Sequence, residues 1–308
     1  MERLARLRDN ITSVYMGNPE AVDRVLVCLL ARGHILIEDV PGVGKTVLAQ
    51  TLARSVECNF ARLQLTPDML PADVIGVTVY SQENENFVFK PGPIFTNILL
   101  ADEINRATPR TQSALLEAMN EAQVSVDGIT RKLDPPFMVV ATQNPFEFEG
   151  TYFLPESQLD RFLMRIHLGY PDPADEARIL TQQPSLGALA DLRPVISRED
   201  VIDLQQKVNA VKMDKTIVDY VIQLATMTRE SDQLEVGVSP RGTLALAQVA
   251  RATAMLNHRD YVVPDDILTN VVPVFSHRVV AKSAMHDGSP LTTARIMQQI
   301  MEGVASPA

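Results

Sequence analysis

A short segment near the N-terminus, residues 37–46, constrains the fold of this chain more than any other feature. It reads Ile-Glu-Asp-Val-Pro-Gly-Val-Gly-Lys-Thr and lies between an apolar, β-prone run (34–37) and a helix-forming run (46–56). A strand, a glycine-containing loop and a helix in this order are typical of a phosphate-binding loop, in which backbone N–H groups at the helix start surround phosphate oxygens. The segment therefore predicts an α/β fold that binds a nucleotide at the end of a strand.

The residues of this loop have separate chemical roles. Gly42 and Gly44 allow the backbone to approach phosphates where a Cβ would obstruct it. Lys45 is expected to reach the β- and γ-phosphates, and the Thr46 hydroxyl is expected to hold Mg²⁺. The usual loop has glycine where this chain has Asp39, and the alternative interpretation is a Gly/Pro turn with an incidental Lys-Thr pair. The residues expected to bind nucleotide here are Pro41, Gly42, Val43, Gly44, Lys45, Thr46 and Val47.

Two further buried-strand patterns end in polar side chains. The apolar run 98–101 leads to Asp102 and Glu103, and the run 137–142 leads to Asn144. The carboxyl ends of parallel strands meet at one edge of a sheet, so these side chains should lie beside the phosphate loop. We expect Asp102 to bind Mg²⁺, Glu103 to polarise the attacking water and Asn144 to hydrogen-bond the γ-phosphate and that water. The alternatives are a surface acidic pair and an Asn-Pro turn.

Two arginines stand in contexts that suit phosphate binding. Arg161 follows Asp160 and precedes a strand-like run at 163–168, and Arg241 opens a helix after Ser239-Pro240. A guanidinium group suits a γ-phosphate because it presents planar forked donors and stays charged. Supplied from a neighbouring subunit, such a group would stabilise the charge of the transition state. Taken singly, arginines of this kind are more often surface ion-pair partners.

The alternation of strands and helices ends near residue 170. Up to that point the chain predicts a parallel sheet flanked by helices, preceded by an N-terminal helix. Two hairpins interrupt it, near 77–89 and 124–131, and Asp127-Gly128 predicts a type I′ turn in the second. Strand patterns then give way to helical periodicity. We therefore predict an α/β nucleotide-binding core at 1–170 and an all-α domain at 171–308.

Charge and cysteine content narrow the range of partners and compartments. A net charge of −10 argues against nucleic acid as the main partner. The two cysteines, Cys28 and Cys58, fit buried reduced thiols rather than a disulfide framework, which favours a reducing compartment. The sequence shows no secretory signal pattern and no run of 18 apolar residues. We expect a cytoplasmic protein that does not span a membrane.

Taken together, these segments resemble the AAA+ ATPases and, within them, the MoxR family. The resemblance covers nearly the whole chain. It implies an AAA+ P-loop core with a parallel sheet and a C-terminal all-α lid, which corresponds to residues 171–308. The segments that carry it are 33–34, 38–46, 100–107, 141–145, 149–152, 154–162 and 239–241.

The resemblance also implies particular roles. Asp102 and Glu103 match the Walker B pair. Arg161 matches the arginine finger that acts on a neighbouring subunit's nucleotide, with the nearby Arg165 as the alternative. The hairpins at 77–89 and 124–131 resemble the helix-2 insert and the pre-sensor-1 hairpin, which face the pore of a ring. Matches to sensor 1 and sensor 2 are Asn144 and Arg241.

The implied activity is Mg²⁺-dependent hydrolysis of ATP to ADP by a homo-oligomeric ring, usually a hexamer. Such proteins resemble chaperones, because they remodel, activate or insert metal into partner proteins, often ones with von Willebrand factor A (VWA) domains. The alternatives are a nucleic-acid motor of the MCM or clamp-loader type, a magnesium-chelatase subunit, and a module that senses nucleotide without turnover. The presence of Glu103 and Asn144 argues against the last.

Overall fold

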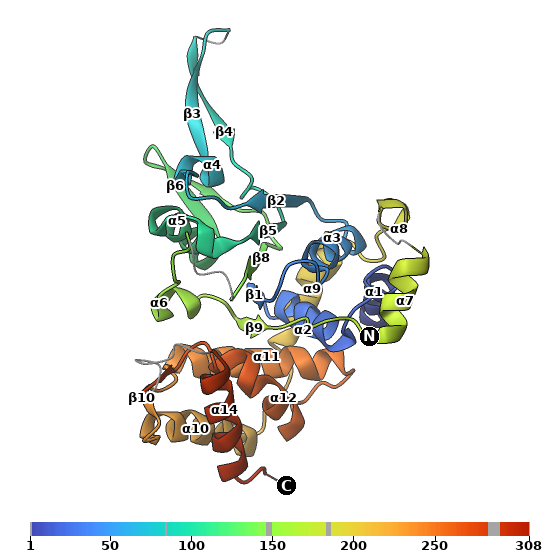
Figure 1. Ribbon diagram of the computed structural model, residues 1–308, viewed down its shortest axis with the longest axis vertical. Helices are drawn as coiled ribbons and strands as arrows, with labels where there is room; N and C mark the ends of the chain where they lie inside the picture. The colour runs from blue at the N-terminus through green and yellow to red at the C-terminus, as the bar shows by residue number, and fades with distance from the viewer. Residues whose placement is uncertain (1, 84, 146–149, 183–185, 283–289, 308) are drawn as a thin grey trace.

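The strand that precedes the phosphate-binding segment lies inside a five-stranded parallel sheet (Figure 1). The computed structural model describes residues 2–83, 85–145, 150–182, 186–282 and 290–307. The strand order is β2-β5-β8-β1-β9. The predicted parallel α/β core is therefore confirmed. The five strands are β1 (Ile35–Glu38), β2 (Phe60–Gln64), β5 (Ile98–Asp102), β8 (Met138–Gln143) and β9 (Met164–Ile166).

The two faces of the sheet belong to two apolar clusters. Ile35 and Ile37 face one cluster together with residues of α1, α2 and α3, while Leu36 faces the other with residues of α5. This follows from the alternation of side chains along a strand. A sheet covered on both faces needs strands that are largely apolar, as β1 and β8 are up to the polar residues at their carboxyl ends. The helical segments of this part are α1 (Glu2–Thr12), α2 (Pro19–Leu30), α3 (Lys45–Ser55), α4 (Pro71–Ile75), η1 (Ile104–Arg106), α5 (Pro109–Glu121) and α6 (Glu156–Leu159).

Both predicted hairpins are present. Asp127 and Gly128 have positive φ angles of 54° and 76°, which a type I′ turn requires. The β3–β4 hairpin extends away from the sheet (Figure 1). Its exposed Tyr80 and Phe87 rings form an edge-to-face pair with centroids 5.4 Å apart. The strands are β3 (Gly76–Ser81), β4 (Asn86–Pro91), β6 (Gln123–Val126) and β7 (Ile129–Lys132).

The C-terminal part is helical, as predicted, but it also contains a small antiparallel sheet. Strands β10 (Leu234–Val236) and β11 (Val280–Ala281) pair there. The prediction of a region without strands missed them, because three and two residues are too few to show a period of two. The helices are α7 (Pro173–Gln182), α8 (Leu186–Asp191), α9 (Arg198–Val208), α10 (Lys215–Glu230), α11 (Pro240–Leu256), α12 (Pro264–Phe275) and α14 (Pro290–Gly303).

Helices from the first and from the later part of the lid pack against the core. Helix α8 packs on α3, and α9 packs on α2, so the first part of the lid lies against core helices (Figure 1). Helix α11 packs on α2, and α12 packs on β9. The division near residue 170 stays a prediction. Among the described residues, every helix is too short or too polar to cross a lipid bilayer.

A buried histidine links β8 to α5 and makes the stability of the fold depend on pH. The His34 Nδ1 accepts a hydrogen bond from the Val139 N–H at 2.9 Å, and Nε2 lies 2.9 Å from the Met119 carbonyl oxygen. With Nδ1 as acceptor and Nε2–H as donor, both nitrogens are satisfied only in the neutral ring. Burial lowers the pKa of His34 from 6.5 to about 4.

Replacing His34 with glutamine is expected to flatten the pH dependence of stability. Because the folded pKa lies below the unfolded pKa, the contribution of His34 is complete above pH 6.5 and is lost as the pH falls toward 4. At about 1.4 kcal/mol per pH unit, the wild type loses about 3 kcal/mol through this group alone. Urea unfolding of both proteins at pH 7 and pH 4.5 checks this, and equal losses in the two would contradict it. Burial also lowers the pKa of His277. Because His277 is present in both proteins, its contribution is common to the two measurements.

Candidate functional site

Most of the predicted site residues line a cavity of about 350 Å³ at the carboxyl edge of the sheet. This volume lies in the range of small-ligand pockets. Val43 was expected to bind nucleotide, but it is buried in the core and is not among the lining residues. The lining residues are Pro41, Gly42, Gly44, Lys45, Thr46, Val47, Arg62, Gln64, Asp102, Glu103 and Asn144.

The loop before α3 has a conformation that suits a phosphate group. Gly42 and Gly44 both have φ of 90°, which L side chains rarely adopt. A Cβ on Gly44 would also come within 3.2 Å of the Tyr15 ring. Gly44 is the N-cap of α3 and offers no side-chain cap, so the N–H groups of the first turn remain available to an anion. Backbone donors and the helix dipole thus converge on the cavity.

Lys45 lies between this loop and the acidic residues of the cavity. Its Nζ donates a hydrogen bond of 2.7 Å to the Asp39 carbonyl oxygen. Partial burial lowers the pKa of Lys45, while the charges of Asp102, Asp39 and Glu103 raise it. An ammonium group held by a backbone carbonyl can turn toward a phosphate without breaking an ion pair.

Asp102 is held by two donors at the end of β5. Its Oδ1 accepts from the Thr142 hydroxyl at 2.5 Å, and its Oδ2 accepts from the Arg62 guanidinium at 2.8 Å. The strand register places Gln64 of β2 opposite Asp102. Asp102 therefore presents an oriented carboxylate to the cavity, and carboxylate oxygens are ligands that Mg²⁺ prefers. Thr46 and Asp102 are the residues that fit such an ion here.

Glu103 has an unusual backbone conformation. Its φ and ψ of 58° and 53° lie in the left-handed region, which costs a non-glycine residue about 1–3 kcal/mol. Its N–H donates to the Thr142 hydroxyl at 3.0 Å. Its Oε2 accepts from Gln64 Nε2 at 2.8 Å and pairs with Arg106 Nε at 3.0 Å. The left-handed turn brings a second carboxylate to the same cavity as Asp102.

The next strand brings an amide to this edge. Asn144 follows β8 and lines the cavity, as predicted. The preceding residue, Gln143, donates to the buried Glu38 carboxylate at the end of β1. The bond between Gln143 and Glu38 fixes the strand end from which Asn144 extends.

Asp39 explains why this loop departs from the usual glycine. Its Oδ2 accepts from the N–H groups of Leu168 and Gly169 at 2.7 and 2.8 Å, and its Oδ1 accepts from Val40 at 3.0 Å. These bonds tie the start of the loop to the chain that leaves β9. Asp39 is therefore a structural residue, and the phosphate-contacting half of the loop begins after it.

The two candidate finger arginines differ in their surroundings. The Arg165 side chain is 8% exposed, lies 3.6 Å from Glu38 Oε1 and donates to the Ser276 hydroxyl at 3.3 Å. Its charge is therefore used inside its own chain. Arg161 is partly exposed, and its guanidinium makes no ion pair or hydrogen bond with the residues that the structure describes.

Arg241 lies beside Asp160 rather than in the cavity. Its guanidinium donates to Asn120 Oδ1 at 2.6 Å and lies 3.8 Å from Asp160 Oδ2. Arg161 follows Asp160 directly in the chain. Neither predicted arginine lines the cavity of its own chain, whereas the other predicted site residues apart from Val43 do.

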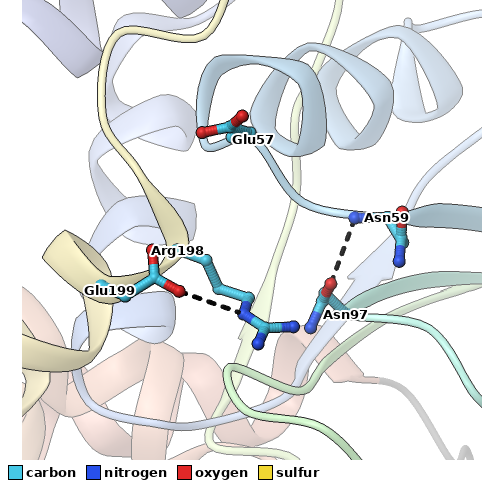
Figure 2. A pocket seen from close by; sticks show the side chains of 5 residues that line it. All are labelled: Glu57, Asn59, Asn97, Arg198 and Glu199. Carbon is cyan, nitrogen blue, oxygen red and sulfur yellow. Dashed lines mark hydrogen bonds and ion pairs between the residues drawn. The ribbon is translucent and has the colours of Figure 1, made fainter.

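A second cavity, of about 290 Å³, lies at the opposite edge of the sheet (Figure 2). Asn97 stands there before β5, and its amide bonds to the Asn59 N–H before β2 and to the carbonyl oxygens of Asp134 and Pro136 before β8. Asn97 therefore aligns the amino ends of three strands. Its polar groups serve the fold, and the cavity gathers none of the predicted site residues.

Four residues of this neighbourhood were not predicted. Arg62 and Gln64 lie two apart on β2, so they point to the same side, but only the pairing of β2 with β5 shows that they face Asp102 and Glu103. Thr142 and Arg278 bind Asp102 and Asp160 through contacts between distant segments. The strand pattern of 137–142 contains Thr142, and a polar residue near the end of an apolar run is the one signal that could have found it.

Comparisons with known proteins agree with this geometry. Residues 34–164 match the family described as "ATPase family associated with various cellular activities (AAA)", and residues 226–300 match the AAA lid domain. Chaperone MoxR1 of Mycobacterium tuberculosis is 40% identical, over 99% of this chain and 82% of the relative. An uncharacterized protein of Bacillus subtilis, YeaC, is 46% identical over 99% and 95%.

A solved structure resembles the whole chain. It is that of a candidate ATPase from Cytophaga hutchinsonii, with a TM-score of 0.91 and 37% identity, covering 100% of this chain and 96% of the other. Two Protein MoxR sequences, from Methylorubrum extorquens and Paracoccus denitrificans, are 29% and 28% identical. Fold, lid and relatives agree, and the chain belongs to the MoxR family of AAA+ ATPases.

Proposed function

We propose that this protein hydrolyses ATP to ADP with Mg²⁺, in a ring of identical subunits, and that it uses the reaction to remodel a protein client. The observation that carries the proposal is the convergence of Lys45, Thr46, Asp102, Glu103 and Asn144 on one cavity. A phosphate loop alone would bind a nucleotide. A second carboxylate and an amide at the same edge add what is needed to direct a water at the γ-phosphate.

Each residue of the cavity has a proposed task. Lys45 and the N–H groups that start α3 bind the β- and γ-phosphates. Thr46 and Asp102 hold Mg²⁺, which would neutralise charge on the phosphates when bound. Glu103 accepts the proton of the attacking water and Asn144 orients that water. Pro41, Gly42, Val43, Gly44 and Val47 complete the nucleotide-binding segment.

The positions of Arg161 and Arg241, outside the cavity of their own chain, support the proposal of a ring. Arg161 is proposed to stabilise the transition state in a neighbouring subunit, since it lies outside its own cavity and its guanidinium is not used within the described residues. Arg241 is proposed to sense the γ-phosphate. That role requires its contacts with Asn120 and Asp160 to break, or the nucleotide to belong to a neighbouring subunit.

The client is proposed to be a protein that carries a VWA domain, as the resemblance to MoxR-type systems implies. The exposed apolar residues of the β3–β4 hairpin support a protein contact rather than a nucleic acid. That hairpin and the β6–β7 hairpin would face the pore of a hexamer. Movement of the core (1–170) against the lid (171–308) would drive them. Two free cysteines, Cys28 and Cys58, support a reducing compartment such as the cytoplasm.

ATP turnover per subunit, measured over a range of protein concentrations, tests the proposal. If sites are shared between subunits, the rate per subunit should rise with concentration until rings are complete, and chelation of Mg²⁺ should abolish it. Light scattering at each concentration reports the assembly state. A rate that stays flat while the protein changes from monomer to oligomer would mean that one chain holds a complete site, and shared sites would be wrong.

A further inference from the structure

We propose that Arg278, which follows α12 of the lid, is a positioning residue for Arg161. It holds the main chain on both sides of Arg161 in the place from which that side chain reaches the neighbouring subunit's nucleotide. This inference rests on the proposed function of Arg161. It adds a second lid residue, after Arg241, to a proposed site that otherwise consists of core residues.

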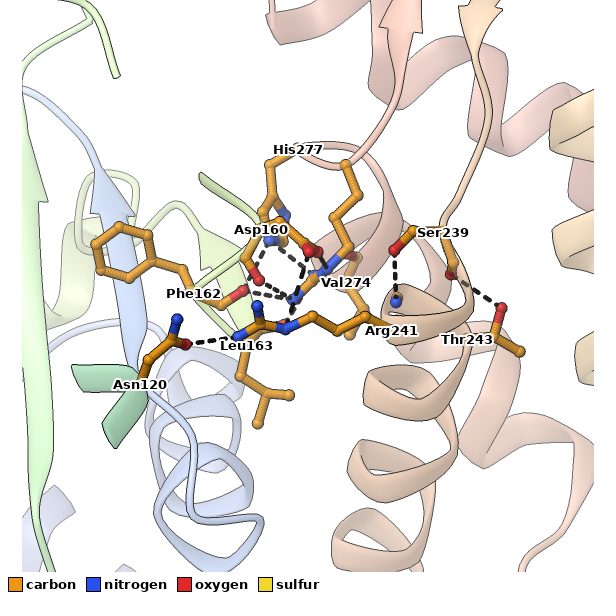
Figure 3. A network of polar contacts seen from close by, with 11 residues as sticks. Asn120, Asp160, Phe162, Leu163, Ser239, Arg241, Thr243, Val274 and His277 are labelled. Carbon is orange, nitrogen blue, oxygen red and sulfur yellow. Dashed lines mark hydrogen bonds and ion pairs between the residues drawn. The ribbon is translucent and has the colours of Figure 1, made fainter. Parts of the chain in front are cut away.

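Arg278 binds the segment around Arg161 on both sides. Figure 3 labels its partners in that segment, Asp160, Phe162 and Leu163. Its Nε donates to Asp160 Oδ1 at 2.7 Å, and Nη2 donates to the carbonyl oxygens of Phe162 at 2.6 Å and Asp160 at 3.4 Å. Its Nη1 donates to the Leu163 carbonyl at 3.2 Å. A single guanidinium fork thus contacts the residue before Arg161 and the two residues after it.

The hydrogen bonds of the Arg278 guanidinium are strong because the group is both buried and charged. Arg278 is 7% exposed. Burial lowers the pKa of Arg278 to about 10, and the Asp160 charge opposes that shift, so the group stays charged at neutral pH. Charge-assisted hydrogen bonds are about twice as strong as neutral ones. A main-chain segment held in this way has little freedom to move.

The neighbours of Arg278 strengthen the same contact. His277 Nε2 lies 3.0 Å from the Phe162 carbonyl oxygen, and the Ser276 hydroxyl accepts from Arg165. Three consecutive lid residues therefore contact the chain between 160 and 165. None of these bonds uses the Arg161 side chain. A rotation of the lid would carry the finger with it.

A matched ion pair within the lid provides a control. Arg259 binds Asp266 through two bonds of 2.6 Å each, as Arg278 binds its own segment through a forked guanidinium. Its hydrogen bonds in the structure go to Asp266 and to the Tyr261 carbonyl, within the lid. Loss of this pair should lower stability without displacing Arg161. A variant at Arg259 therefore distinguishes general damage to the lid from displacement of the Arg161 side chain.

The test is subunit complementation between inactive variants. Arg161→Ala subunits keep an intact cavity, and Glu103→Gln subunits keep an intact finger, so their mixture should recover turnover. Arg278→Gln alone should lose about 10²-fold in turnover, the cost of a misplaced catalytic group. Mixed with Glu103→Gln it should recover to within about twofold of the first mixture, since a misplacement of the finger leaves the cavity usable. Mixed with Arg161→Ala it should stay inactive.

Each outcome decides a separate point. If Arg161→Ala and Glu103→Gln do not complement, the shared site is wrong and the role of Arg278 falls with it. If they complement but Arg278→Gln is fully active, or is not recovered by Glu103→Gln, the positioning role is overturned while the shared site stands. Should Arg278→Gln fail to fold, Asp160→Asn must show the same pattern, and full turnover in that variant overturns the role. Arg259→Gln should keep wild-type turnover throughout.

Discussion

Subunits in which alanine replaces Arg161 are expected to hydrolyse ATP about 10³–10⁵-fold more slowly than the wild type at saturating nucleotide. A finger supplied by a neighbour acts on charge that develops in the transition state, so its loss should lower kcat far more than nucleotide affinity. The variant should still assemble and bind ATP, because Arg161 lies outside the cavity. Single-turnover hydrolysis and nucleotide titration of assembled protein measure the two effects separately.

Arg198→Ala is the control for this variant. Arg198 is a partly exposed arginine at the opposite edge of the sheet, where it pairs with Glu199 at 3.8 Å (Figure 2). Its loss should leave turnover within about twofold, as is usual for exposed ion pairs. Full activity of Arg161→Ala would show that another residue serves as the finger. Arg165 is poorly placed for that role, because its side chain is buried against Glu38.

Glutamine at position 103 is expected to lower turnover by about 10²–10⁴-fold, the usual contribution of a general base. Nucleotide affinity should change little, since Lys45 and the start of α3 are the groups proposed to hold the phosphates. The amide keeps an acceptor for Gln64 and Arg106, so the local structure should persist. Steady-state turnover and ATP titration of the same preparation give both quantities.

Glu199→Gln removes a carboxylate at the opposite edge of the sheet and serves as the matched control. It should leave turnover unchanged. If Glu103→Gln also left turnover unchanged, Glu103 would not be the base. The protein would then be closer to a module that senses nucleotide without turnover.

The phosphate loop and the strand ends were predictable from sequence because their chemistry is local. Gly42 and Gly44 adopt the positive φ angles that the loop requires, and Lys45 and Thr46 follow them directly. Asp102 and Asn144 each come at the end of an apolar run. Parallel pairing then brings these ends together without any further information.

The partners of those residues were beyond the sequence pattern. Gln64 and Glu103 are 39 positions apart, and their contact depends on the pairing of β2 with β5. Asp160 and Arg278 are 118 positions apart, and their contact depends on how α12 packs on β9. Neither separation matches the short repeat of a helix or a strand. The pairing of distant segments is a property of the whole fold, so a local motif cannot reveal it.

Val43 shows that a local motif can also mark a residue whose side chain does not face the cavity. A motif marks residues by position in the loop, yet the Val43 side chain belongs to the apolar core beneath it. Its side chain therefore supports the loop from below. The motif marks the whole segment and cannot separate its two faces.

The strand order also has a consequence for synthesis of the chain. β1 is made before β2, but the two are not neighbours, because β1 lies between β8 and β9 in the sheet that the structure describes. The first strand therefore has no partner until residue 138 has left the ribosome, although its own residues are complete at 38. Before that point the proposed nucleotide-binding loop has no sheet behind it, so ATP is not expected to stabilise a nascent chain. For about a hundred residues of elongation, apolar β1 must remain covered by other means.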